Sequence, residues 1–229
     1  MIVAHFSDLH FGAATLGEAG RCFGAAIEQA AAAKVEAAVI SGDATDYGLG
    51  LHEPATLRLA YLVRRLADHC PVLMLQGTFS HEPPGTLGVF RLLGARHPVH
   101  VSERIEQVAL SFDGQWLASE GWRFEAVPQG TRALLTCVPT LNKARLAANE
   151  GASGETGARL AELLAGFAPS NREARGRGIP TAAVSHGTIF GSINEHGVPM
   201  AGLDHEFTPG ALFAAGAQAV PVVTPLRTG

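Results

Sequence analysis

The chain has little cysteine, and the three cysteines that it has are far apart. Among its 229 residues only Cys22, Cys70 and Cys137 carry thiols, each in an apolar or helical context. An odd number of widely spaced cysteines argues against both a disulfide framework and a thiolate zinc site, and it favours buried thiols in a reducing compartment. We therefore expect a cytoplasmic protein.

Long apolar runs and a leader-type amino terminus are also lacking. No apolar stretch is long enough to span a bilayer. The first residues show neither the basic flank nor the cleavage pattern of a signal peptide, and Asp8 interrupts them early. These features predict a protein that neither crosses a membrane nor is exported.

Positive charge is not in excess. The formal net charge is -4 at pH 7, so the chain has no general attraction for a polyanion, and nucleic-acid binding would need a local basic surface or a bound metal. Hydrophobic residues make up 47% of the chain. At this length that content predicts one sizeable core, or a core with a small appendage, rather than disorder.

What the first part of the chain does contain is an alternation of strand-like and helix-like patterns. We expect strands over residues 2–7, 37–41 and 71–75, and helices over residues 21–34 and after Pro54. Such alternation with short connections predicts a mostly parallel sheet covered by helices. Ligands of such sheets bind outside the carboxyl ends of the strands.

The pattern changes after Val99. Short β-like runs with a turn at Asp113-Gly114 predict an antiparallel second sheet or an extension of the first, with strands over residues 108–112, 116–118, 122–127 and 133–138. The later part predicts a helix over 160–167, an exposed loop over 170–178, a strand over 179–185, and a final helix to about Gln218 capped by Thr208.

Acidic and histidine side chains follow several of these apolar stretches. Asp8 and His10 lie two residues apart after the first predicted strand, where alternate residues point to the same side. Oxygen and nitrogen donors suit manganese, iron or zinc, and phosphate chemistry needs such ligands to converge from several strands. The converging set is Asp8, His10, Asp43, His81 and His186. We expect Asp43 to bridge two ions, and Asp46 to cap the turn that follows it.

In this order the motifs resemble those of the calcineurin-like metallophosphoesterase superfamily, most of all its SbcD-type DNA repair exonuclease branch. Asp8-Leu9-His10 matches Asp-x-His, residues 42–46 match Gly-Asp-x-x-Asp, and Ser185-His186-Gly187 matches the later histidine motif. The resemblance covers nearly the whole chain. It implies an α/β fold in which a sandwich of two mixed β-sheets is flanked by helices, in a single domain over residues 1–229.

The resemblance also implies roles for individual residues. Asp8 and His10 would bind the first metal, Asp43 would bridge, His186 would bind the second metal, and His81 would be the catalytic residue beside the phosphate. The third motif of the family, Gly-Asn-His followed by Asp or Glu, is expanded here over residues 77–82. Ser80 takes the position of the usual asparagine ligand, and its short neutral hydroxyl predicts weak binding of the second ion.

One motif of the family is missing. The superfamily supplies two more histidines in a Gly-His-x-His motif after the last helix, whereas residues 217–229 contain no histidine. We expect a carboxyl-terminal truncation or a shifted reading frame that removes one ligand from each metal, with a genuinely divergent end as the alternative. This predicts weak metal retention, and two tightly held ions per chain after manganese loading would contradict it.

The leading hypothesis is thus a metal-dependent hydrolase, a phosphodiesterase that acts on DNA ends with two divalent ions, Mn²⁺ or else Fe or Zn. Resemblance to the nuclease branch implies a coiled-coil ATPase partner and a homodimer. One alternative is a phosphoesterase for small molecules or nucleotides, since fold does not fix function. The other is a noncatalytic binding module with a degraded site.

Overall fold

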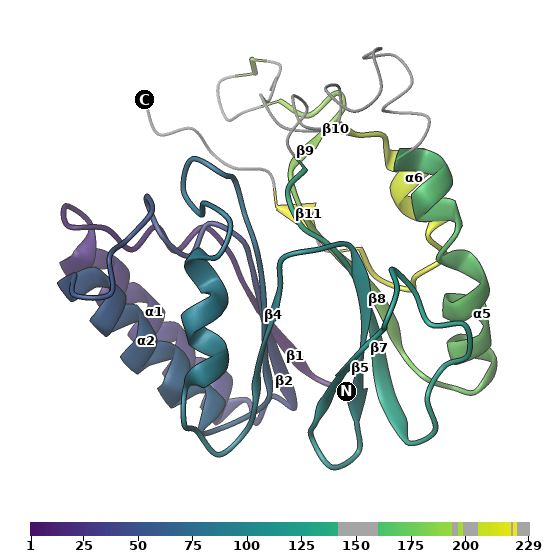
Figure 1. Cartoon of the computed structure of the whole chain (residues 1–229), viewed down its shortest axis with the longest axis horizontal. Coiled ribbons are helices and arrows are strands. Elements are labelled where there is room, and N and C mark those ends of the chain that lie inside the picture. The colour runs from purple at the N-terminus through teal and green to yellow at the C-terminus, as the bar shows by residue number, and fades with distance from the viewer. Residues whose placement is uncertain (142–159, 194–196, 199–205, 221, 224–229) are drawn as a thin grey trace. The chain divides into compact units, whose positions relative to one another are not determined.

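The computed structural model describes residues 1–141, 160–193, 197–198, 206–220 and 222–223 (Figure 1). The chain divides into two compact units. The first unit comprises Met1–Glu103 and Ser111–Trp116, and the second comprises Arg104–Leu110 and Leu117–Gly229.

The first unit is built on a four-stranded parallel sheet in the order β1-β2-β3-β4. Its strands are β1 (Val3–Phe6), β2 (Ala37–Ser41), β3 (Val72–Leu75) and β4 (Val99–Ser102). Helices α1 (Leu16–Ala32) and α2 (Pro54–Ala67) pack side by side against one face of this sheet, and the short helix η1 (Thr86–Leu92) follows β3 (Figure 1). The predicted parallel sheet with covering helices is confirmed for this unit.

The core of the first unit explains why these segments adopt their structures. α2 has fully buried side chains at Leu59, Leu62, Val63 and Leu66, and the strands β2 and β3 are buried along their whole length. Apolar residues at a spacing of three and four form one face of a helix, and continuous apolar runs suit strands buried on both faces. The expected strand over 37–41 and the helix after Pro54 are confirmed, while α1 begins earlier than predicted, at Leu16.

The second unit contains a five-stranded mixed sheet in the order β11-β8-β7-β5-β6. Its strands are β5 (Glu106–Ser111), β6 (Trp116–Ala118), β7 (Thr131–Val138), β8 (Thr181–His186) and β11 (Val222–Val223). β8 pairs in parallel with β7 and with β11. The expected turn at Asp113-Gly114 joins β5 to β6, where Ser111 N donates to Gln115 O at 2.9 Å.

Helices and two short strands complete the described part of the second unit. Residues 160–165 are helical, α5 spans Ala168–Gly176 and α6 spans Pro209–Ala214, while β9 (Thr188–Ile189) pairs with β10 (Glu206–Phe207). Thr208 caps α6 through its hydroxyl, which accepts from Ala211 N, so the predicted cap is confirmed although the helix ends before Gln218. Over the described residues no helix combines the length and apolar character needed to cross a membrane.

Two expectations for the middle and later chain are wrong. Residues 122–127 form no strand, whereas residues 99–102 form β4, which extends the first sheet in parallel with β3. The segment 170–178, expected to be a loop, lies largely in α5, whose buried face consists of small and polar side chains. Asn171 on that face donates to Thr136 Oγ1 and to Ala215 O, so hydrogen bonds replace the apolar pattern that sequence reasoning looks for. The first sheet is also parallel rather than mixed.

Candidate metal centre

The candidate site lies where β1, β2 and β3 end. Because the strands are parallel, their carboxyl ends meet at one edge of the sheet. We call the segments that follow them the β1 loop (residues 7–15), the β2 loop (42–53) and the β3 loop (76–85). The β1 and β2 loops run side by side, since Asp8 N donates to Gly42 O at 3.2 Å and His10 N donates to Asp43 O at 3.0 Å.

Three residues of these loops adopt a left-handed backbone. Asp8, His10 and Asp43 have φ angles of 52°, 44° and 50°, and among the described residues Lys34 is the one other non-glycine with positive φ. Aspartate and histidine tolerate this region better than most residues. A strained conformation costs roughly 1–3 kcal/mol and persists where the surroundings enforce it, which is common at functional sites.

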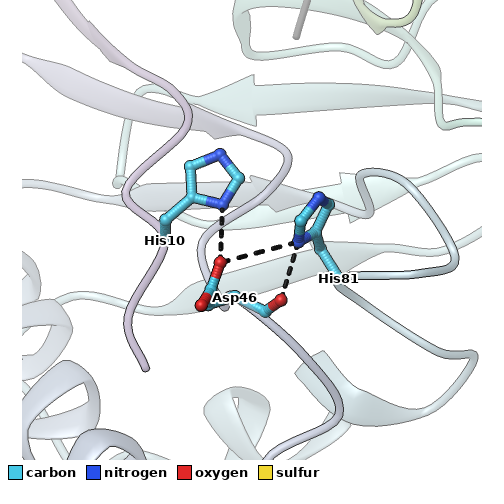
Figure 2. A group of neighbouring side chains, drawn as sticks. All are labelled: His10, Asp46 and His81. Carbon is cyan, nitrogen blue, oxygen red and sulfur yellow. Dashed lines mark hydrogen bonds and ion pairs between the residues drawn. The ribbon is translucent and has the colours of Figure 1, made fainter. Parts of the chain in front are cut away.

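His10, Asp46 and His81 form a compact group contributed by all three loops (Figure 2). Each offers a potential ligand atom, and these atoms lie within 4.8 Å of one another. Asp46 Oδ1 lies 3.4 Å from His10 Nδ1 and 3.9 Å from His81 Nδ1. The two imidazole rings meet edge to face with centroids 4.7 Å apart. The sequence predicts His10 and His81 as site residues but does not include Asp46 in the site.

One hydrogen bond and two ion-pair contacts of Asp46 define how the two imidazoles are oriented. His81 Nδ1 lies 2.7 Å from the main-chain oxygen of Asp46. Because a carbonyl only accepts hydrogen bonds, Nδ1 carries a proton, and Nε2 is the ring nitrogen that does not bond to Asp46. His10 points Nδ1 at Asp46 and Nε2 at Asp8 Oδ1, 3.8 Å away. Metal-binding histidines are commonly oriented in this way by a carboxylate at the second nitrogen.

The expected capping role of Asp46 is therefore wrong: its carboxylate faces two imidazoles and not the amides of the following turn. Close packing on the β1 loop holds it there, because a Cβ on Gly12 would lie 2.8 Å from Asp46 Cβ. The signal available in the sequence was the Gly-Asp-x-x-Asp spacing, which already included this residue.

Asp8 has an incompletely satisfied carboxylate. Its Oδ2 accepts from Ser7 Oγ at 2.5 Å, whereas Oδ1 is buried and has no hydrogen-bond partner in the described part of the chain. An unsatisfied buried polar atom costs about 1–3 kcal/mol, more when charged. Asp8 raises the pKa of the His10 imidazole above its ordinary value, because its carboxylate lies 3.8 Å from His10 Nε2 and stabilises the charged ring, and Asp43 adds to this effect against the opposing influence of burial. A cation would satisfy Asp8 Oδ1.

Asp43 is fully buried and is held by the residue that follows Gly77. Thr78 donates its backbone N–H to Asp43 Oδ1 at 2.7 Å, and its hydroxyl lies 2.9 and 3.1 Å from the two carboxylate oxygens. Any Cβ at Gly77 would lie 2.2 Å from both Asp43 N and Asp43 Oδ1, so only glycine permits this approach.

The hydroxyl beside Asp43 is thus Thr78, which sequence reasoning missed, and not Ser80. Ser80 is exposed and makes no hydrogen bond within the described residues. The available signal was that Thr78 directly follows the motif glycine, as the asparagine does in the family pattern. A direct metal bond from Ser80 remains a prediction that this geometry does not favour.

His186 lies in the second unit. It is the last residue of β8, as its motif predicts, and its side chain is fully buried. Its carbonyl accepts from Thr140 Oγ1 at 3.0 Å. Its approach to Asp8 and Asp43 remains a prediction, and the expected change at the carboxyl terminus lies largely outside the described residues.

The donors gathered in the first unit fit a divalent cation. They combine imidazole nitrogen with carboxylate oxygen, the set preferred by Mn, Fe and Zn, and they include a buried carboxylate oxygen that lacks a partner. No family model matches the chain, and no curated protein sequence matches it either.

Proposed function

We propose that the chain is a metal-dependent phosphoesterase with a calcineurin-like sandwich fold. The observation that carries this proposal is the group of nitrogen and oxygen donors at the ends of three adjacent parallel strands. The site combines left-handed backbone, the buried Asp43 carboxylate and the buried Asp8 Oδ1, which has no hydrogen-bond partner among the described residues. Ion pairs on a solvated surface rarely show these features together.

Asp8, His10, Asp43 and His186 would hold the metal ions, two divalent cations such as Mn²⁺. Such ions supply Lewis acidity, which polarises a phosphoryl oxygen and lowers the pKa of water. Thr78 orients the Asp43 carboxylate by two donors, and Asp46 orients the His10 ring so that Nε2 faces Asp8. The protein part of the mechanism is therefore a fixed set of acceptors that needs little rearrangement on binding a cation.

His81 would handle a proton at the leaving oxygen. Its Nδ1 is committed to the Asp46 carbonyl, and its side chain is 31% exposed, so Nε2 is the ring atom left to exchange a proton with a substrate. A positioned general acid contributes about 10²–10⁴-fold to a rate. Asp46 keeps the His81 ring in this tautomer.

For the substrate we propose a DNA end, and for the wider assembly a dimer that works with a coiled-coil ATPase, as in the exonuclease branch that the motifs resemble. The exposed Ser80 supports a second candidate, a binding module that holds cation or phosphate with little turnover. Hydrolysis confined to small phosphate esters would indicate the nucleotide or small-molecule alternative.

The proposed function is tested by replacing Asp43 with alanine. Purified protein with Mn²⁺ is expected to hydrolyse bis(p-nitrophenyl) phosphate and linear duplex DNA, and Asp43→Ala is expected to reduce both rates to the metal-only background, because the buried acceptor between the loops is lost. Initial rates over a range of Mn²⁺ concentrations give the measurement.

The matched control is Asp113→Ala, which removes an aspartate in the turn between β5 and β6, outside the candidate site. It should leave the rates unchanged. Equal hydrolysis by the wild-type protein and Asp43→Ala would show that the metal mechanism is wrong. Manganese binding without hydrolysis of either substrate would favour the noncatalytic module.

A further inference from the structure

Glu82 is a fully buried carboxylate that joins two loops of the candidate metal centre. Its Oε1 accepts from the backbone N–H of Ala44 at 2.5 Å and from that of Thr45 at 3.4 Å, both in the β2 loop. Its Oε2 accepts from Gly77 N at 2.5 Å in the β3 loop. One side chain thus satisfies amides that lie more than 30 residues apart in the chain.

The backbone around Glu82 is held by further hydrogen bonds. Thr45 Oγ1 donates to the carbonyl of His81 at 2.8 Å, and Gln76 Nε2 donates to the carbonyl of Glu82 at 2.9 Å. The amides bound by the carboxylate belong to residues next to the site: Ala44 follows Asp43, and Gly77 precedes Thr78. Any shift of these amides moves the Asp43 carboxylate relative to the donors that hold it.

We propose that Glu82 is a positioning residue that locks the β2 loop onto the β3 loop and thereby sets the geometry in which the site holds its cation. The proposal rests on the function proposed above, because it takes the site to be a cation site. A carboxylate suits this role since it is an acceptor at both oxygens, and charge-assisted bonds to backbone amides are short and strong. Supporting residues of this kind typically change metal affinity about 10–100-fold when replaced.

Two variants separate the effect of the side-chain length of Glu82 from the effect of its two acceptor oxygens. Glu82→Gln keeps the size but has a single acceptor, so its NH₂ group must face an N–H of one loop. Glu82→Asp keeps both acceptors but is one methylene shorter and cannot span both loops. The matched control is Glu53→Gln, because the Glu53 carboxylate also accepts a backbone amide, from Gly50 at 2.8 Å, but within the β2 loop alone.

The experiment measures Mn²⁺ binding by calorimetry and amide hydrogen exchange by NMR on the full chain. Glu82→Gln and Glu82→Asp are expected to bind Mn²⁺ about 10–100-fold more weakly than wild type, and to lose protection at Ala44 and Gly77. Glu53→Gln should change neither quantity. In the wild-type protein the amides of Ala44 and Gly77 should be protected from exchange. This measurement does not depend on the folding of any variant.

The outcomes are distinguishable. Fast exchange of Ala44 and Gly77 in wild type, or unchanged affinity in both Glu82 variants, would overturn the proposal. If the wild-type protein binds no Mn²⁺, the proposed function fails, and the exchange of these two amides alone decides whether Glu82 locks the loops.

Discussion

At the scale of single residues, the site depends on carboxylates that are buried yet satisfied. Asp43 and Glu82 are both fully buried, and each accepts hydrogen bonds from backbone amides of another loop. Burial of a charge is costly unless such donors compensate it. Asp8 differs from both, because one of its oxygens is buried without a donor. This contrast marks Asp8 as the carboxylate that most needs a cation.

The pairing of His10 with Asp8 gives a testable pH dependence. In metal-free protein we expect the NMR titration of His10 to show a pKa above the ordinary value of about 6.5, because Asp8 stabilises the charged ring. Asp8→Asn should bring this pKa down. Since the folded pKa is raised, the protonated ring stabilises the metal-free fold below pH ~6.5, and this contribution is lost as pH rises through the folded pKa.

Manganese affinity should change in the opposite sense over the same window, because a metal needs the unprotonated imidazole. It should weaken as pH falls through the raised pKa of His10. Asp113→Asn serves as the control and should leave the titration unchanged. A His10 pKa at or below the ordinary value would contradict the arrangement of Asp8 and His10.

At the scale of elements, sequence patterns succeeded where burial is apolar and failed where it is polar. α2 and the strand over 37–41 were predictable because their buried residues repeat at helical spacing or form a continuous apolar run. α5 was not predictable, because Ser170 and Asn171 are buried through hydrogen bonds rather than through apolar contact. Such partners become visible only after the chain has folded.

The packing of α2 gives a prediction at this scale. Leu62 is fully buried in the core of the first unit, so Leu62→Ala should lower the free energy of unfolding by about 2–5 kcal/mol. Leu57 on the same helix is 63% exposed, so Leu57→Ala should change the free energy of unfolding by no more than about 0.5 kcal/mol. Urea unfolding followed by circular dichroism measures both, and equal losses would show that α2 does not pack as described.

At the scale of the whole molecule, the reactivity of the three cysteines depends on the packing of both units. Cys22 is exposed on α1, whereas Cys70 and Cys137 are buried in the first and second unit respectively. Burial raises the pKa of the Cys70 thiol to about 11, which keeps it protonated and unreactive at neutral pH. The expectation of buried thiols therefore holds for two of the three cysteines.

A thiol titration follows from this distribution. With Ellman's reagent at pH 8 we expect one thiol of the native protein to react quickly and all three to react in denaturant. Cys22→Ser should abolish the fast phase and leave two thiols in denaturant. A second fast thiol in the native protein would mean that one of the two units opens readily.

The sequence by itself determined the α/β class, the parallel sheet of the first unit, and the placement of Asp8, His10, Asp43, His81 and His186 at or just beyond strand ends. These features are local, since periodicity and the position of a polar residue after an apolar run can be read along the chain. Only the tertiary structure decided that Asp46 orients two imidazoles, that Thr78 rather than Ser80 holds Asp43, and that Glu82 joins two loops. Those roles depend on which backbone amides and carbonyls meet across more than 30 residues, and sequence spacing does not encode such distances.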